Sequence, residues 1–161
     1  MKPYQQFTTY NIMIIDPDYK SREIFDRLLS SFSQTHIVGK FSHPREIPGE
    51  LSRYRPDLIL LDIHLVESEV AAFKEFLQTL GDRVCIVLTS FIHHNAFEFL
   101  SRHVFATIMK PVDPEEVARL LQRFAAFMAP NQRSGCNGFG NHLSFDKALV
   151  VYLNPSTFES C

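Results

Sequence analysis

The chain has 161 residues, of which 45% are hydrophobic and 12% aromatic, so it can bury the core of one domain with an appendage. A formal net charge of −2 gives no global attraction to nucleic acid, and every apolar run is far shorter than the roughly 20 residues of a membrane span. The opening sequence MKPYQQFTTYN has no apolar signal-peptide segment, and the three cysteines are scattered without metal-ligand spacing. We therefore expect a reduced, cytoplasmic setting and no membrane partner.

Apolar runs of strand length alternate with helical patterns through the first 129 residues, which is the order of repeated β-α-β units. The runs are almost continuously apolar, as is typical of strands that are buried on both faces of a parallel sheet. In chain order we expect a strand over 11–15, a helix over 18–32, a strand over 36–41, a short or distorted helix ending near 54 and a strand over 58–63. There follow a helix over 68–80, a strand over 84–88, a fourth helix centred on 96–102, a strand over 104–109 and a helix over 113–128.

Local signals set the expected ends of these helices. Pro48 and Gly49 interrupt the second helix. Ser68 is expected to cap the third helix, with acidic neighbours near its positive end. Asp113 followed by Pro114 opens the last helix. The whole pattern predicts an α/β fold, a doubly wound five-stranded parallel sheet with helices on both faces and a short C-terminal extension.

The two ends of the chain are predicted to lie outside this domain. Residues 1–9 form an N-terminal extension, and the domain itself occupies residues 10–129. The polar, glycine-rich sequence NQRSGCNGFGN predicts a linker over 130–142. The tail, 143–161, contains one strand or a small hairpin. Linker and tail together, roughly thirty residues, are too few for a stable independent domain.

Four predicted strands are each followed by a polar residue at the C-terminal end. Asp16 follows IMII, Asp62 follows LILL, Thr89 follows IVL and Lys110 follows TIM. Each residue alone has an ordinary interpretation as a strand-end or surface residue. In open α/β sheets, however, ligands bind at this edge. An acid, a hydroxyl and a base gathered there suit a phosphoryl group.

The sequences IMIIDPD, PDLILLDIHL, VCIVLTS and IMKPVDPEEV, in this order and spacing, resemble the receiver domain of two-component response regulators over about residues 10–129. The resemblance implies a flavodoxin-like fold with strand order 2-1-3-4-5. It implies that Asp62 accepts a phosphoryl group from a histidine kinase or phosphotransfer protein. It also implies that Thr89 bonds a phosphoryl oxygen and that Lys110 pairs with Asp62 or its phosphate.

The resemblance further implies a Mg²⁺ site formed by Asp16, Asp62 and the backbone carbonyl of His64. Receivers usually carry two consecutive acids after the first strand, but here Pro17 stands in the second place and has no side-chain oxygen. One ligand is therefore missing unless Asp18 turns toward the site. We expect Mg²⁺ to bind more weakly than in a receiver with both acids.

Other departures concern the output surface. Val66 and Val70 replace the usual proline and glycine after the acceptor, and Thr107 stands where an aromatic switch residue is usual. Phe105, two positions earlier, is expected on the same strand face as Thr107. In this family, helix four, strand five and helix five commonly form a dimer surface. The residues that this chain offers there are His94, Phe97, Arg102, His103, Glu115, Arg119 and Arg123.

Two alternatives to a phosphorylatable receiver stay open. The first is a pseudo-receiver, a phosphorylation-independent interaction module that keeps the fold without the metal-dependent chemistry. The second is a phosphatase of the haloacid dehalogenase type, with Asp16 as nucleophile and Asp18 as general acid. Lys20 stands where that pattern has threonine or valine, and Asp62 would be left unexplained. We therefore expect no enzymatic activity.

The tail sequence LSFDKALVVYLNPSTFE faintly resembles the opening strands of a winged-helix effector. The functional interpretation is the beginning of a DNA-binding output domain, and the alternative is an extension that folds back on the receiver. DNA is therefore an expected partner only if an effector domain follows.

Overall fold

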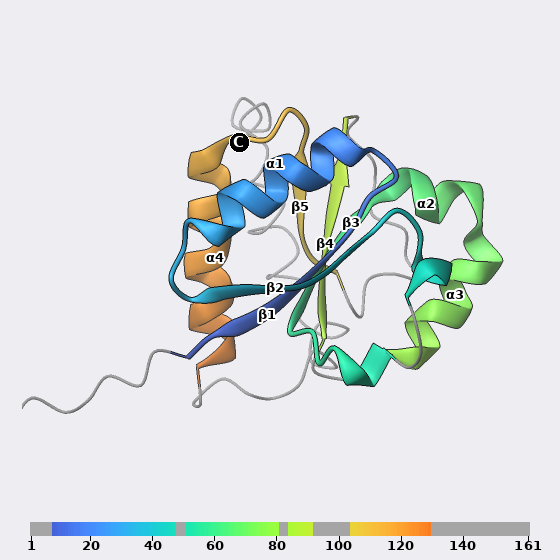
Figure 1. Ribbon diagram of the computed structural model, residues 1–161, viewed down its shortest axis with the longest axis horizontal. Coiled ribbons are helices and arrows are strands. Elements are labelled where there is room, and N and C mark those ends of the chain that lie inside the picture. Colours follow the sequence, from blue (N-terminus) through green and yellow to red (C-terminus); the bar gives the residue numbers. More distant parts are fainter. Residues whose placement is uncertain (1–7, 48–50, 81–83, 92–103, 130–161) are drawn as a thin grey trace, which may run out of the picture.

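The computed structural model describes residues 8–47, 51–80, 84–91 and 104–129 (Figure 1). The predicted N-terminal extension falls almost wholly outside these residues, as do the fourth helix, the linker and the tail. In chain order the elements are β1 (Tyr10–Ile15), α1 (Tyr19–Ser30), β2 (Thr35–Phe41), the 3-10 turns η1 (Pro44–Glu46) and η2 (Leu51–Arg53), β3 (Leu58–Asp62), α2 (Ile63–Ser68), α3 (Val70–Thr79), β4 (Cys85–Ser90), β5 (Val104–Met109) and α4 (Pro114–Met128).

The five strands form one parallel sheet in the order β2-β1-β3-β4-β5, which confirms the predicted topology. The register places the carboxyl ends of four neighbouring strands at the same level. Asp62 pairs with Thr89, while Asp16 and Lys110 directly follow the last paired residues of β1 and β5. The strand order alone therefore brings the four predicted site residues to one edge.

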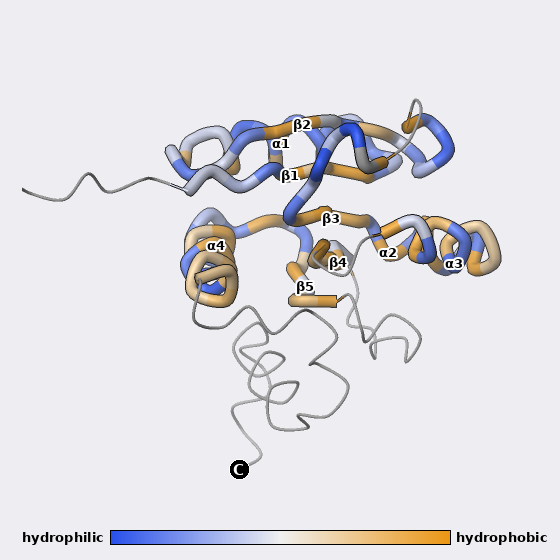
Figure 2. Tube along the Cα trace, turned by 90° about the horizontal axis from the view of Figure 1, so that it is seen from below, coloured by the Kyte–Doolittle hydropathy of each residue, from blue (hydrophilic) through white to orange (hydrophobic). Residues whose placement is uncertain are grey.

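Side chains alternate between two hydrophobic cores, one on each face of the sheet. Ile12 and Ile14 of β1 face α1 and α4, whereas Met13 and Ile15 face α2 and α3. Figure 1 shows the helices in these two groups, and in Figure 2 the central strands carry mostly hydrophobic colours. Helices on both faces are thus as expected. Where the second helix was expected to be short or distorted, the chain makes the two turns η1 and η2.

The expected helix over 68–80, capped by Ser68, was wrong at its start. The carboxylate of Asp62 accepts a hydrogen bond from the backbone N–H of His64 and so caps a helix that begins directly after β3. Ser68 consequently falls in the last turn of α2, where its hydroxyl donates to the carbonyl of Leu65. Glu69 takes the cap position of α3, with no side-chain cap hydrogen bond.

The expectation that Phe105 shares a face with Thr107 was also wrong, because β5 contains a bulge. Val104 pairs with Ile86 and Ala106 pairs with Val87, so Phe105 is the extra residue. Its ring lies in the core beside α4, with its centroid 5.6 Å from that of Phe124. Thr107 follows the normal alternation from Ala106 and faces the opposite side.

Among the residues that the structure describes, no helix is long and apolar enough to cross a membrane.

Candidate functional site

Three of the predicted site residues meet in one buried ion cluster. The ammonium nitrogen of Lys110 lies 2.6 Å from Asp16 Oδ2 and 2.6 Å from Asp62 Oδ2. All three side chains are at most 3% exposed. Because the ammonium is equally close to both acids, Lys110 bridges them and does not pair with Asp62 alone. The peptide bond between Lys110 and Pro111 is cis.

The remaining carboxylate oxygens accept backbone hydrogen bonds. Asp16 Oδ1 accepts from the N–H of Asp18 at 2.8 Å, and Asp62 Oδ1 accepts from the N–H of His64 at 2.8 Å. Burial raises the pKa of Asp16 above its ordinary value of 3.8, against the opposing effect of the hydrogen bond from Lys110. Each of the four oxygens thus has a donor, and the two carboxylates are fixed in orientation.

Unlike the carboxylate oxygens of Asp16 and Asp62, the buried hydroxyl of Thr89 makes no hydrogen bond. Leaving such a group without a partner costs about 1–3 kcal/mol. Its register position opposite Asp62 places it at the same edge of the sheet as the ion cluster. An unpartnered hydroxyl beside an acid is suited to receive a ligand oxygen that arrives at that acid.

The loop after β1 is held by α1. The carboxylate of Asp18 accepts the backbone N–H groups of Lys20 and Ser21 and the hydroxyl of Ser21, so it caps α1. The guanidinium of Arg22 donates to the backbone carbonyls of Asp16 and Pro17. These contacts turn the Asp18 carboxylate toward the helix and not toward Asp62.

The divalent cation that the resemblance implies does not fit the resting arrangement of these residues. Pro17 brings no ligand, Asp18 is the α1 cap, and the Oδ2 atoms of Asp16 and Asp62 are both bound to Lys110. The backbone carbonyl of His64 belongs to α2 and is directed along that helix. Within the described part of the chain, no group of three acidic, histidine or cysteine side chains could hold a metal ion.

Phe91 is a site residue that sequence reasoning missed. Its ring centroid lies 5.1 Å from the Lys110 ammonium, and the residue is 57% exposed. The backbone N–H of Lys110 donates to the carbonyl of Ser90 at 2.7 Å, which keeps the ends of β4 and β5 together. The only sign of Phe91 in the sequence is that a large apolar residue directly follows Thr89 and Ser90 at the end of a strand.

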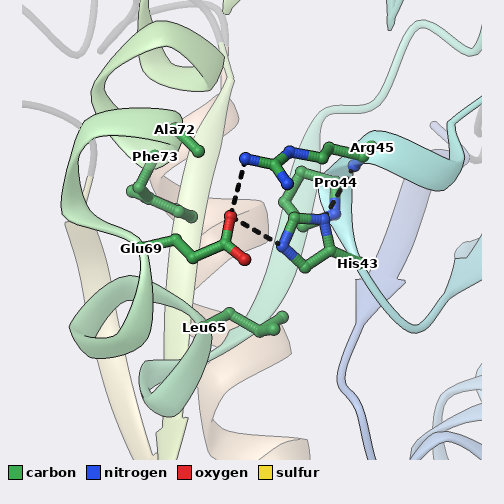
Figure 3. A pocket seen from close by; sticks show the side chains of 7 residues that line it. All are labelled: His43, Pro44, Arg45, Leu65, Glu69, Ala72 and Phe73. Atoms are coloured by element: carbon green, nitrogen blue, oxygen red, sulfur yellow. Dashed lines mark hydrogen bonds and ion pairs between the residues drawn. The ribbon is translucent and has the colours of Figure 1, made fainter.

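A separate small cavity lies between η1 and the α2–α3 junction (Figure 3). There the Glu69 carboxylate lies 2.9 Å from the Arg45 guanidinium and 3.6 Å from the His43 ring. The cavity volume of about 20 Å³ leaves room for about one water molecule. It is separate from the site predicted from the strand ends.

Comparisons with known proteins show the family to which the chain belongs. A family profile described as "Response regulator receiver domain" matches residues 12–122. The chain is 27% identical over 112 residues to the transcriptional regulatory protein BtsR of Escherichia coli. It is 22% identical over 113 residues to the sensory transduction protein LytT of Bacillus cereus. Each alignment covers 70% of this chain and 46% of the relative, so the chain spans less than half the length of these relatives.

Solved structures show the same fold. The isolated REC domain of RcsB from Salmonella enterica serovar Typhimurium in the apo form matches with a TM-score of 0.61 and 12% identity, over 73% of this chain and 89% of that one. The response regulatory domain of protein mrkE from Klebsiella pneumoniae matches with a TM-score of 0.56 and 20% identity, over 72% of this chain and 95% of that one.

Proposed function

The chain belongs to the response regulator receiver family, whose members are phosphoacceptor signalling domains rather than enzymes, and from this premise we propose that Asp62 is its phosphoacceptor. The observation that carries the proposal is the bridge from Lys110 to Asp62 at the carboxyl edge of the sheet, with the unpartnered Thr89 hydroxyl at the same level.

The proposed step is transfer of a phosphoryl group from a phosphohistidine to Asp62. A carboxylate oxygen of Asp62 forms a bond to phosphorus as the phosphorus–nitrogen bond of the donor breaks. The electron pair of that bond stays on the imidazole, which takes a proton from solvent. Lys110 balances the negative charge that arrives, and Thr89 donates its hydroxyl to a phosphoryl oxygen.

Receivers act with histidine kinases, and we propose a histidine kinase or phosphotransfer protein as the donor of this chain. The surface of the fourth predicted helix, β5 and α4 is the proposed output and dimer surface. Of the residues predicted there, His94, Phe97, Arg102 and His103 lie outside the described residues. Glu115 and Arg119 pair within α4 at 3.6 Å. A DNA-binding role requires an effector domain after the linker.

Receiver domains typically bind Mg²⁺. In this chain we expect binding so weak that millimolar Mg²⁺ does not fill the resting site, because Pro17 supplies no ligand and Lys110 holds the Oδ2 atoms of Asp16 and Asp62. The cytoplasmic location stays a prediction.

The second candidate function is the pseudo-receiver. One observation favours it: every oxygen of Asp16 and Asp62 already has a hydrogen-bond donor in the resting protein.

The two functions separate in a labelling experiment with acetyl phosphate. The intact protein mass is followed across a Mg²⁺ titration for the natural chain, Asp62→Asn and Pro17→Asp. For a receiver we expect a phosphoryl adduct that is absent from Asp62→Asn and increases in Pro17→Asp. An adduct that forms only in Pro17→Asp makes the natural protein a pseudo-receiver. An adduct that forms to the same extent in Asp62→Asn and in the natural chain rejects Asp62 as acceptor.

A further inference from the structure

The charges of the side chains in the ion cluster nearly cancel one another. Asp16 and Asp62 bring two negative charges and Lys110 brings one positive charge, while the neighbouring Pro17 is neutral. One negative charge therefore remains among these side chains. A divalent cation added beside Lys110 would reverse the sign of the cluster, and like charges at close range inside a protein repel strongly.

The oxygen atoms that a divalent cation would use are held by Lys110. The Lys110 ammonium is equally close, at 2.6 Å, to the Oδ2 atoms of Asp16 and Asp62. The two Oδ1 atoms are turned to backbone N–H groups, which hold the carboxylates so that the Oδ2 atoms meet at the ammonium. A Mg²⁺ ion binds through one or two carboxylates at about 2.0–2.1 Å, and the Oδ2 atoms are the ones not turned to a backbone N–H, so it would compete with Lys110 for them.

In addition to the two carboxylates, the ring of Phe91 contacts the Lys110 ammonium. Its ring lies within the range over which a cation is attracted to an aromatic face. More than half of Phe91 is exposed, so less than half of its apolar surface contributes by burial. The carbonyl of the preceding Ser90 is bonded to the Lys110 N–H, which sets ring and ammonium side by side. The attraction between the Phe91 ring and the Lys110 ammonium therefore helps to hold Lys110 in place.

We propose that Lys110, positioned by Phe91, is the resident cation of the Asp16–Asp62 pair and keeps divalent cations out of the resting site. The proposal concerns the resting protein and does not depend on whether Asp62 accepts a phosphoryl group. Phe91 is a positioning residue in this arrangement, because it acts through Lys110.

The test measures binding of Mn²⁺ alone to the full chain by electron paramagnetic resonance. We expect Lys110→Met to bind Mn²⁺ at least about tenfold more tightly than the natural chain, since a positive charge is removed from two buried carboxylates. Adding Asp16→Asn to Lys110→Met should abolish that gain, which separates this site from adventitious surface binding. Equal affinities of the natural chain and a folded Lys110→Met overturn the proposal.

Two variants test the part played by Phe91. Phe91→Leu keeps an apolar side chain but removes the aromatic face, so we expect tighter Mn²⁺ binding than in the natural chain. Phe91→Tyr keeps the aromatic face and should bind as the natural chain does. Identical affinities of the leucine and tyrosine variants reject the positioning role.

A measurement on the natural chain keeps the proposal testable if Lys110→Met does not fold. The side-chain nitrogen resonance of Lys110 should stay unchanged by NMR as Mg²⁺ is added to millimolar concentrations. A saturable shift of that resonance, with Asp62 still unmodified, overturns the proposal.

Discussion

Replacing Lys110 by methionine should destabilise the protein far more than the same change at a surface lysine. Methionine keeps an apolar chain of similar length, so the change mainly removes the ammonium and its two hydrogen bonds. Asp16 and Asp62 are then left buried without a counter-charge. Removing one partner of a buried ion pair costs about 3–5 kcal/mol. That is a large part of the total stability of a typical domain, about 5–15 kcal/mol.

Lys40 offers a matched control. Its ammonium also contacts two acids, Glu23 at 2.7 Å and Asp26 at 2.6 Å, but its side chain is 32% exposed. Exposed ion pairs contribute about 0.2–1 kcal/mol. The two lysines each contact two acids at closely similar distances and differ chiefly in burial, so Lys40→Met should cost at most about 1 kcal/mol.

The assay is urea unfolding of both variants in the presence of a chelator, followed by circular dichroism. With a slope of about 1–3 kcal/mol per molar urea, Lys110→Met should lower the midpoint by about 2 M and Lys40→Met by much less. Adding Asp16→Asn to Lys110→Met should restore part of the loss, since only one buried carboxylate remains. Equal losses in the two lysine variants would refute the reasoning, because burial would then have no effect.

Three further outcomes follow from the same structure. Thr89→Val should leave stability unchanged or raise it by about 1 kcal/mol, because the buried hydroxyl has no partner to lose; a loss of that size in urea unfolding contradicts this. The hydrogen bond from Lys40 lowers the pKa of Asp26 from its ordinary value of 3.8, so the pair stabilises the fold above pH 3.8. This contribution should disappear as the pH falls through the lower, folded-state pKa, and the pH dependence should be flatter in Lys40→Met. Limited proteolysis should cut first within residues 135–141 if these form a linker, and resistance there while the rest is intact contradicts the separate tail.

The fold was predictable because its main signals are local and repeated. Continuous apolar runs separated by helical patterns define a parallel sheet, and the ends of those runs locate Asp16, Asp62, Thr89 and Lys110. Sequence reasoning also placed Asp113 correctly as the cap of the last helix, where its side chain accepts the N–H of Glu115.

What could not be predicted depends on competition between neighbours. Asp62 and Ser68 are both good caps, and only the end of β3 decides that a helix starts at the earlier one. The bulge at Phe105 reflects pairing with β4, which the sequence of β5 alone does not contain. The sharing of Lys110 between two acids and its contact with Phe91 are likewise properties of the assembled sheet edge.

The most direct test of the central claim identifies the modified residue chemically. The protein is incubated with acetyl phosphate and Mg²⁺, treated with borohydride, which reduces an aspartyl phosphate to homoserine, and mapped by peptide mass spectrometry. We expect homoserine at position 62 in the natural chain and a larger fraction in Pro17→Asp. Homoserine at position 16 or 18 in place of 62 would contradict it, as would complete absence of homoserine from both proteins.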